Sequence, residues 1–140
     1  MFKNTIHVEL SKIIIDEKRE DQIIVLKEKE GMRQFPIVIG LLEASSIKMK
    51  LSNIEPPRPM THDLLVSCIE GLGGKLERLI IDKMVNNTFH AKLDIRTKQG
   101  KKIFVDARPS DGIALSVRMS AQLFVEEEVL KKAAIFQGEQ

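Results

Sequence analysis

TFHAKLDIRT, residues 88–97, alternates apolar and polar side chains along its whole length. Phe89, Ala91, Leu93 and Ile95 fall on one parity, and polar residues occupy the other in between. Neighbouring side chains of a strand point to opposite faces of a sheet, so this alternation predicts a strand with one buried face.

The sequence on either side of this strand predicts a three-stranded antiparallel meander. Asn86-Asn87 before the strand and Gln99-Gly100 after it are typical turn residues, and each connects it to another apolar stretch. A second meander of the same kind precedes it in the chain. The predicted strands cover residues 6–10, 22–29, 33–39, 75–85, 88–97 and 101–106. Residues 13–15 continue the first strand or its neighbour, and residues 123–125 form a short strand or a connector.

A change of hydrophobic period from two to about 3.6 residues predicts four helices. Ile113 and Val117 lie on the apolar side of the third helix, so we expect them to share one core with Phe89, Leu93 and Ile95. Thr61 and Ser110 are favourable N-cap residues. The predicted helices cover residues 41 to about 53, 61 to the glycines at 71–74, 109 or 110 to 119, and 126 to about 136.

The second of these helices has an apolar side, which we expect to be buried against the sheet. Cys68 lies on it, and we interpret this cysteine as a small buried side chain. The apolar side consists of Leu64, Leu65, Cys68, Ile69 and Leu72.

Runs of strands separated by helices are typical of the α+β class. We therefore expect two three-stranded meanders in a largely antiparallel or mixed sheet, covered by about four helices. A length of 140 residues suits one domain. That domain is expected over residues 1–136, followed by a polar tail at 137–140.

Composition narrows the functional classes. Lys+Arg 22 against Asp+Glu 20 gives a net charge of +2, which is weaker than the basic excess of a dedicated nucleic-acid binder. Six Phe, no Trp and no Tyr leave few rings on which bases could stack, so a bound nucleic acid should be held mainly by its backbone. Apolar runs are too short for a membrane span, no signal peptide is visible, and a single cysteine excludes an internal disulfide. These features predict a cytoplasmic protein with no membrane association.

Two Arg-Pro motifs stand at the starts of predicted helices. Arg58-Pro59 precedes Thr61, and Arg108-Pro109 precedes Ser110. Free amides at a helix N-terminus, together with a nearby guanidinium, can bind phosphate or carboxylate. The spacing therefore indicates phosphate binding by Arg58, Arg108, Thr61 and Ser110.

Carboxylates surround the same motifs. Asp63, Asp106 and Asp111, together with Glu43, offer hard oxygen ligands for Mg²⁺ or Mn²⁺. A metal ion and an arginine at one phosphodiester would form a hydrolytic site. The alternative is structural, because these carboxylates also favour helix N-termini and can pair with the arginines. His62 is either an acid or base, or a solvated residue of the first helical turn.

Several blocks of this sequence resemble, in the same order, the motifs of the bifunctional nuclease domain family. The resemblance covers roughly residues 5–130. It departs from the family pattern at Gly112, where alanine is expected. The matching blocks are LKEKEG at 26–31, FPIVIG at 35–40 with Glu43-Ala44, PRPMTHDLL at 57–65 and VDARPSDGIAL at 105–115.

This resemblance implies a divalent-metal-dependent nuclease that acts on DNA and RNA phosphodiesters. Placed on the motif positions, it implies that Asp63, Asp106 and Asp111 handle metal or water and that His62 is an auxiliary acid or base. The competing class is a non-catalytic regulatory or interaction module that binds an anionic ligand or a partner through the same Arg and Asp residues.

The strand-rich chain is also expected to form a homodimer. Exposed sheet edges invite pairing with another chain, and a two-fold dimer is the commonest closed assembly. We expect the edges at residues 6–10 or 88–97.

Overall fold

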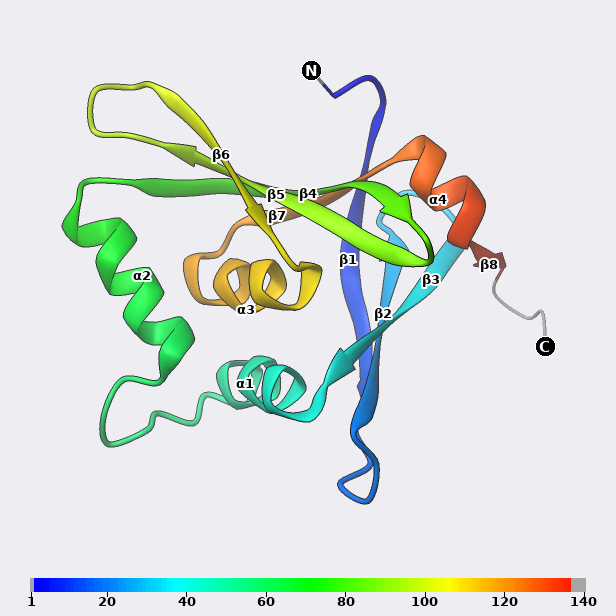
Figure 1. Ribbon diagram of the computed structural model, residues 1–140, viewed down its shortest axis with the longest axis horizontal. Helices are drawn as coiled ribbons and strands as arrows, with labels where there is room; N and C mark the ends of the chain where they lie inside the picture. Colours follow the sequence, from blue (N-terminus) through cyan, green and yellow to red (C-terminus); the bar gives the residue numbers. More distant parts are fainter. Residues whose placement is uncertain (1, 137–140) are drawn as a thin grey trace.

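The computed structural model describes residues 2–136, so the polar tail predicted at 137–140 lies outside the described residues. Strands form one mixed sheet with helices packed on it, which confirms the α+β class (Figure 1). In chain order the elements are β1 (Thr5–Ile14), β2 (Asp21–Glu28), β3 (Arg33–Gly40), α1 (Leu41–Leu51), α2 (Thr61–Gly71), β4 (Lys75–Val85), β5 (Thr88–Arg96), β6 (Lys102–Ala107), α3 (Pro109–Met119), β7 (Gln122–Glu126), α4 (Glu127–Ala133) and β8 (Ile135–Phe136).

Both predicted meanders are present, and β7 joins them. The strand order is β6-β5-β4-β7-β1-β2-β3-β8. All pairs within β1-β2-β3 and within β4-β5-β6 are antiparallel. β7 pairs in parallel with β4 and antiparallel with β1, so the stretch predicted as a short strand or connector is a central strand of the sheet.

The sheet is strongly curved around its core. Four strands lie between β5 and β3 in the sheet order. The ring of Phe89 on β5 nevertheless lies 5.7 Å from that of Phe35 on β3, centroid to centroid. α1 and α3 pack on each other, α3 covers β4 and β5, and α1 covers β2 and β3. This arrangement brings the starts of α1 and α3 together.

The predicted shared core is confirmed. Leu93 and Ile113 are buried, and Phe89, Ile95 and Val117 pack against the same cluster while keeping part of their surface exposed. Among residues 2–136, no helix is long and apolar enough to cross a membrane.

Gly112 allows α3 to lie close to β4. A Cβ atom at this position would overlap the side chain of Leu79, which is fully buried. The glycine that departs from the family pattern is therefore explained in this chain by close packing of a helix on a strand.

The prediction that α2 buries its apolar side is wrong. Leu64, Leu65, Cys68 and Leu72 are exposed, and Ile69 is half-buried. The reason is the position of α2 at one end of the molecule, where it contacts α3 and β4 and leaves its other side uncovered (Figure 1).

Two smaller expectations about helix ends are also corrected. The N-cap residues are Met60 and Arg108, so Thr61 and Ser110 lie inside the first turns. The carboxylate of Asp63 accepts the Met60 amide at 3.0 Å and caps α2 in place of a hydroxyl. Pro109 occupies the first position of α3, where its missing N–H costs nothing.

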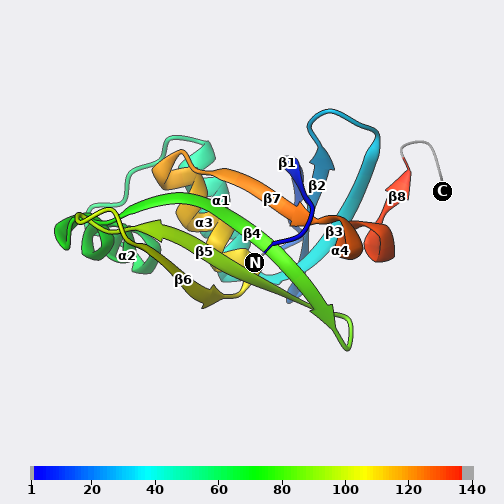
Figure 2. The same ribbon diagram turned by 90° about the horizontal axis from the view of Figure 1, so that it is seen from above.

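The predicted sheet edges are wrong as well, because β1 and β5 both lie inside the sheet. β7 covers the free side of β1, and β6 covers that of β5. Figure 2 shows β6 as the outermost strand on its side of the sheet.

The final helix is shorter than predicted. α4 ends at Ala133, and β8 then pairs with the beginning of β3. Arg33 of β3 holds this region by binding Glu127 at 2.7 Å and Glu28 at 2.9 Å. Glu127, which no local sequence pattern links to Arg33, therefore anchors α4 to the sheet.

Replacing Arg33 by glutamine should lower the free energy of unfolding by about 1–3 kcal/mol at pH 7. Hydrogen bonds from Arg33 hold the pKa values of Glu28 and Glu127 below their ordinary value of 4.5. Carboxyl groups with a lowered pKa in the folded state stabilise it above the unfolded pKa, and this contribution disappears as the pH falls through the folded value. Urea unfolding should thus separate wild type from Arg33→Gln at pH 7 and bring them together as the pH falls through the lowered pKa values of Glu28 and Glu127. A constant difference at all pH values, or none beyond that of exposed Lys12→Gln, would contradict the assignment.

Candidate functional site

The starts of three helices meet around one cavity of about 310 Å³. α1 contributes Glu43, α2 contributes His62, and α3 contributes its N-cap residue Arg108 together with Asp111. In each case the N-cap residue is extended and the helix begins abruptly. First-turn side chains from three separate sequence blocks are therefore presented at one place.

His62 is buried, and both of its ring nitrogens are hydrogen-bonded. Nδ1 lies 2.7 Å from Ser46 Oγ, and Nε2 lies 2.9 Å from Asp111 Oδ1. An ionised carboxylate can only accept, so Nε2 carries the proton that it donates to Asp111. In the neutral ring Nδ1 is then an acceptor for the Ser46 hydroxyl. This tautomer leaves Nδ1 able to receive a proton through Ser46.

The guanidinium of Arg108 donates two hydrogen bonds to the carboxylate of Asp111. Its Nε donates to Oδ2 at 2.8 Å and its Nη2 to Oδ1 at 3.1 Å, and Nη2 also reaches Glu43 Oε2 at 3.3 Å. Partial burial raises the pKa of Asp111, but hydrogen bonds from Arg108 and His62 outweigh it and leave this pKa below its ordinary value. The same contact raises the pKa of Arg108. The Arg108 side chain is 65% exposed, and its Nη1 makes no hydrogen bond to any residue in the range 2–136.

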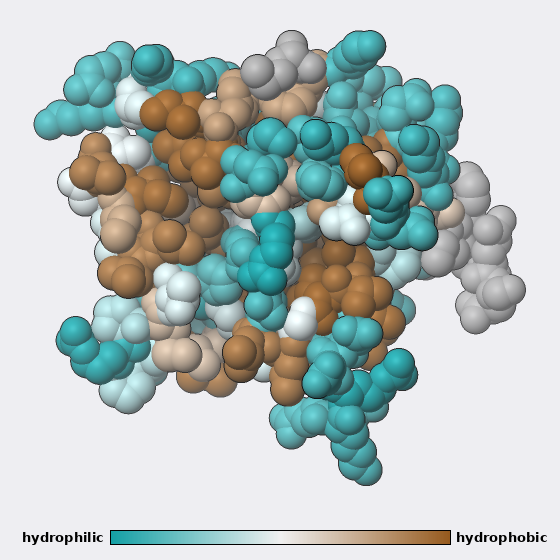
Figure 3. Space-filling view, viewed as in Figure 1, coloured by the Kyte–Doolittle hydropathy of each residue, from teal (hydrophilic) through white to brown (hydrophobic). Residues whose placement is uncertain are grey.

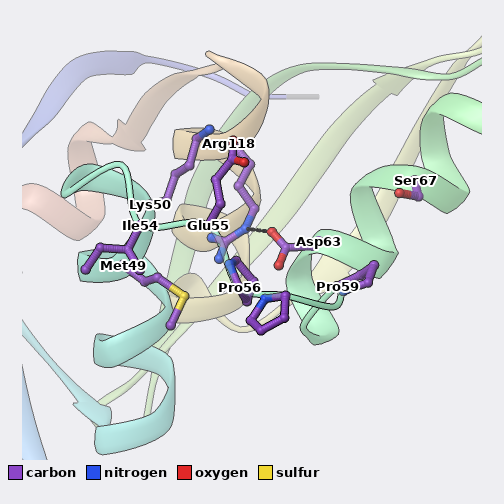
Figure 4. A pocket seen from close by; sticks show the side chains of 10 residues that line it. Met49, Lys50, Ile54, Glu55, Pro56, Pro59, Asp63, Ser67 and Arg118 are labelled. Atoms are coloured by element: carbon purple, nitrogen blue, oxygen red, sulfur yellow. Dashed lines mark hydrogen bonds and ion pairs between the residues drawn. The ribbon is translucent and has the colours of Figure 1, made fainter.

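Arg118 and Ser46 belong to the site, although no sequence motif pointed to them. Arg118 is only 6% exposed and donates to Asp63 Oδ1 at 2.9 Å, to the Ala114 carbonyl at 2.9 Å and to Ser46 Oγ at 3.0 Å. Figure 4 shows its guanidinium directed at Asp63, beside the proline-rich loop that lines a neighbouring cavity of about 270 Å³. The Arg118 hydrogen bond and the Met60 amide lower the pKa of Asp63. One signal was available: Arg118 follows Asp111 by two helical turns and so lies on the same side of α3.

Other residues assigned from sequence lie around this centre or away from it. Thr61 is exposed at the cavity rim, and Ser110 is buried in the first turn of α3 beside a further cavity of about 390 Å³. Arg58 is exposed and has no ion pair or hydrogen bond within the described part of the chain. Asp106 is 76% exposed and faces away from α3, where it pairs with Lys92 at 3.3 Å.

The four carboxylates expected to bind a cation are therefore not gathered around one point. Asp111 and Glu43 contact Arg108, Asp63 contacts Arg118, and Asp106 lies elsewhere. Within residues 2–136, no three His, Cys, Asp or Glu side chains are arranged to hold a metal ion. The donor set as it stands does not fit Mg²⁺ or Mn²⁺, which need several free oxygen ligands.

The sequence blocks that supply His62, Arg108 and Asp111 to this cavity all lie within the part of the chain that matches a known domain family. Residues 24–138 match the bifunctional nuclease domain family, and the chain belongs to that family.

Relatives extend the comparison. An uncharacterized protein of Mycobacterium tuberculosis, found in strains H37Rv and CDC 1551, is 37% identical over 123 residues, which are 88% of this chain and 73% of the relative. Bifunctional nuclease 2 of rice (Oryza sativa subsp. japonica) is 25% identical over 119 residues, covering 82% of this chain and 36% of the rice protein.

Proposed function

We propose that this chain is a nuclease that cleaves the phosphodiesters of DNA and RNA at the cavity formed by the starts of α1, α2 and α3. The observation that carries the proposal is the convergence of His62, Asp111, Arg108 and Glu43 from three distant sequence blocks onto that cavity. Family membership and the name of the rice relative support the same conclusion.

Arg108 is the phosphate-binding group in this proposal. Two of its nitrogens are held by carboxylates, which orient the guanidinium, and Nη1 is left for a phosphate oxygen. Because few aromatic side chains are present, contacts of this kind to the backbone should supply most of the affinity.

His62 is the acid and base. A proton from the attacking hydroxyl, which is a 2′-hydroxyl in RNA and water in DNA, passes through Ser46 Oγ to His62 Nδ1. Asp111 stabilises the imidazolium that results, because its carboxylate already accepts the Nε2 proton. The same proton can return to the leaving oxygen.

Purified chain should cleave single-stranded RNA and DNA, and cleavage should persist in excess EDTA. The reason is that arginines occupy the carboxylates that a cation would need. Initial rates with EDTA, with Mg²⁺ and with Mn²⁺ measure the effect. Loss of activity in EDTA with recovery on adding Mg²⁺ or Mn²⁺ would favour the divalent-metal hypothesis and would contradict the metal-free route. Asp106→Asn, at a carboxylate outside the cavity, should cleave like wild type.

A non-catalytic module that binds an anionic ligand is the second candidate. The observation that favours it is the mutual neutralisation of Arg108 with Asp111 and of Arg118 with Asp63, which would equally serve a structural network. Absence of cleavage together with salt-sensitive binding of a labelled oligonucleotide, lost in Arg108→Ala, would establish this candidate over the nuclease.

A further inference from the structure

β6 leaves one edge of the sheet open. It is the outermost strand, and it pairs only with β5 among the described strands. Its outer N–H and C=O groups can therefore accept another strand, and natural edge strands normally carry features that prevent such pairing. Here β6 offers six residues of regular strand without a bulge or a proline.

The sequence of β6 is complementary to itself in antiparallel orientation. If a two-fold axis passes beside Phe104, Lys102 of one copy faces Asp106 of the other, and the reverse pair forms at the opposite end. Ile103 then faces Val105. Opposite charges and β-branched side chains are both favourable as cross-strand pairs. This register places every charged residue of the strand opposite its counter-charge.

The face of β6 on the helix side of the sheet is apolar, and part of it is uncovered. Ile103 is 42% and Val105 is 40% exposed, and both lie on the same side as Ile95 and Leu93, their register partners. Side chains of this kind are normally buried, so a second layer of structure is expected against them.

The exposed side of α2 continues this apolar surface. Ile69 of α2 and Ile95 of β5 both lie against Gly74, which brings the end of α2 next to the strand that β6 pairs with. Figure 3 shows hydrophobic residues extending from the beginning of β6 down over α2 on the left of the view. Leu72, the C-cap residue of α2, is 86% exposed.

We propose that a second copy of this chain occupies this surface, forming a two-fold dimer through antiparallel β6 to β6 pairing with the exposed side of α2 facing the partner. Two strands of this length bury much less than the roughly 1,200 Å² of a stable interface, so the apolar side chains of α2 must contribute. Because the charges of β6 are complementary to those of a second, antiparallel β6, an identical chain is a better partner for this edge than an unrelated protein.

Sedimentation of the full chain at tens of micromolar should give twice the 15.9 kDa of one chain. Lys102→Asp and Asp106→Lys should each weaken the dimer on the order of tenfold or more, because each places like charges opposite each other at two positions. Lys132→Asp makes the same charge change on α4, away from β6, and should leave the mass unchanged. Circular dichroism establishes that each variant is folded.

Mixing the two single variants should restore the dimer. In the mixed pair, the carboxylate introduced at position 102 of one chain faces the ammonium introduced at position 106 of the other, and the unchanged Lys102 and Asp106 face each other at the second position. Any effect of a substitution on the folding of its own chain is the same before and after mixing. Recovery of the dimer on mixing therefore measures only the contact between the two chains. A monomeric wild type, or dimers unaffected by either variant, overturns the proposal.

Cys68 reports on α2, because it is exposed in the single chain and is the sole cysteine. A thiol reagent should label wild type several-fold more slowly than the Lys102→Asp variant. Equal labelling rates would show that α2 is not part of the interface. The β6 pairing is tested separately by sedimentation.

Discussion

His62→Gln is expected to lower the cleavage rate by about 10²–10⁴-fold, the usual contribution of a positioned acid or base. Glutamine can still donate a hydrogen bond to Asp111, so the fold around the cavity should survive, but it cannot take up a proton at the Nδ1 position. Initial rates on single-stranded RNA and DNA, measured beside the melting temperature, separate lost chemistry from lost folding.

Ser46→Ala should lower the rate in the same direction if the proton passes through the Ser46 hydroxyl. His90→Gln is the matched control, because His90 lies on β5 and does not line the cavity. A folded His62→Gln variant that cleaves as fast as wild type would exclude the acid and base role.

Arg118→Met should reduce the free energy of unfolding by about 1.5–3 kcal/mol, the usual contribution of hydrogen bonds to charged groups, because Arg118 is 6% exposed while its partner Asp63 is still 30% exposed. The substitution leaves Asp63, the Ala114 carbonyl and Ser46 without the donor that Arg118 provides. Urea unfolding measures the loss, and exposed Arg58→Met provides the comparison.

A double variant of Arg118 and Asp63 tests the ion pair directly. Asp63→Asn removes the charge that Arg118 neutralises, so the double variant should be less destabilised than the sum of the single changes. Strict additivity of Arg118→Met and Asp63→Asn would show that the observed ion pair contributes no stability.

Local periodicity was sufficient to predict both meanders and most helix positions, because each of these elements has a polar and an apolar side. It was insufficient for α2, whose apolar side is exposed, since periodicity identifies an apolar side but not what covers it. Asp94 is the opposite case, a charged residue that is buried. It was expected on the polar face, yet Arg78 binds it at 2.8 Å and lies over the rings of Phe2 and Phe124, so the carboxylate is buried.

The candidate site was predictable where a motif contained it. His62, Arg108, Asp111 and Glu43 were all assigned from sequence, and the structure brings them together. Asp106 lies close to Arg108 in the sequence, but strand alternation turns its side chain to the opposite face of the sheet.

The partners Ser46 and Arg118 could not be assigned from motifs. They reach the centre through the packing of α1 on α3, which no short stretch of sequence encodes.

The central place of β7 has a consequence for how the chain is made. In the sheet, β1 pairs with β7 and β7 pairs with β4, and β7 follows both meanders in the sequence. During synthesis the two meanders can therefore form separately, but they cannot join into one sheet until β7 has left the ribosome. Pairing across such a sequence separation is slow, because a long loop must close before the contacts form. Chains truncated before Gln122 should expose the unpaired edges of β1 and β4 and should aggregate.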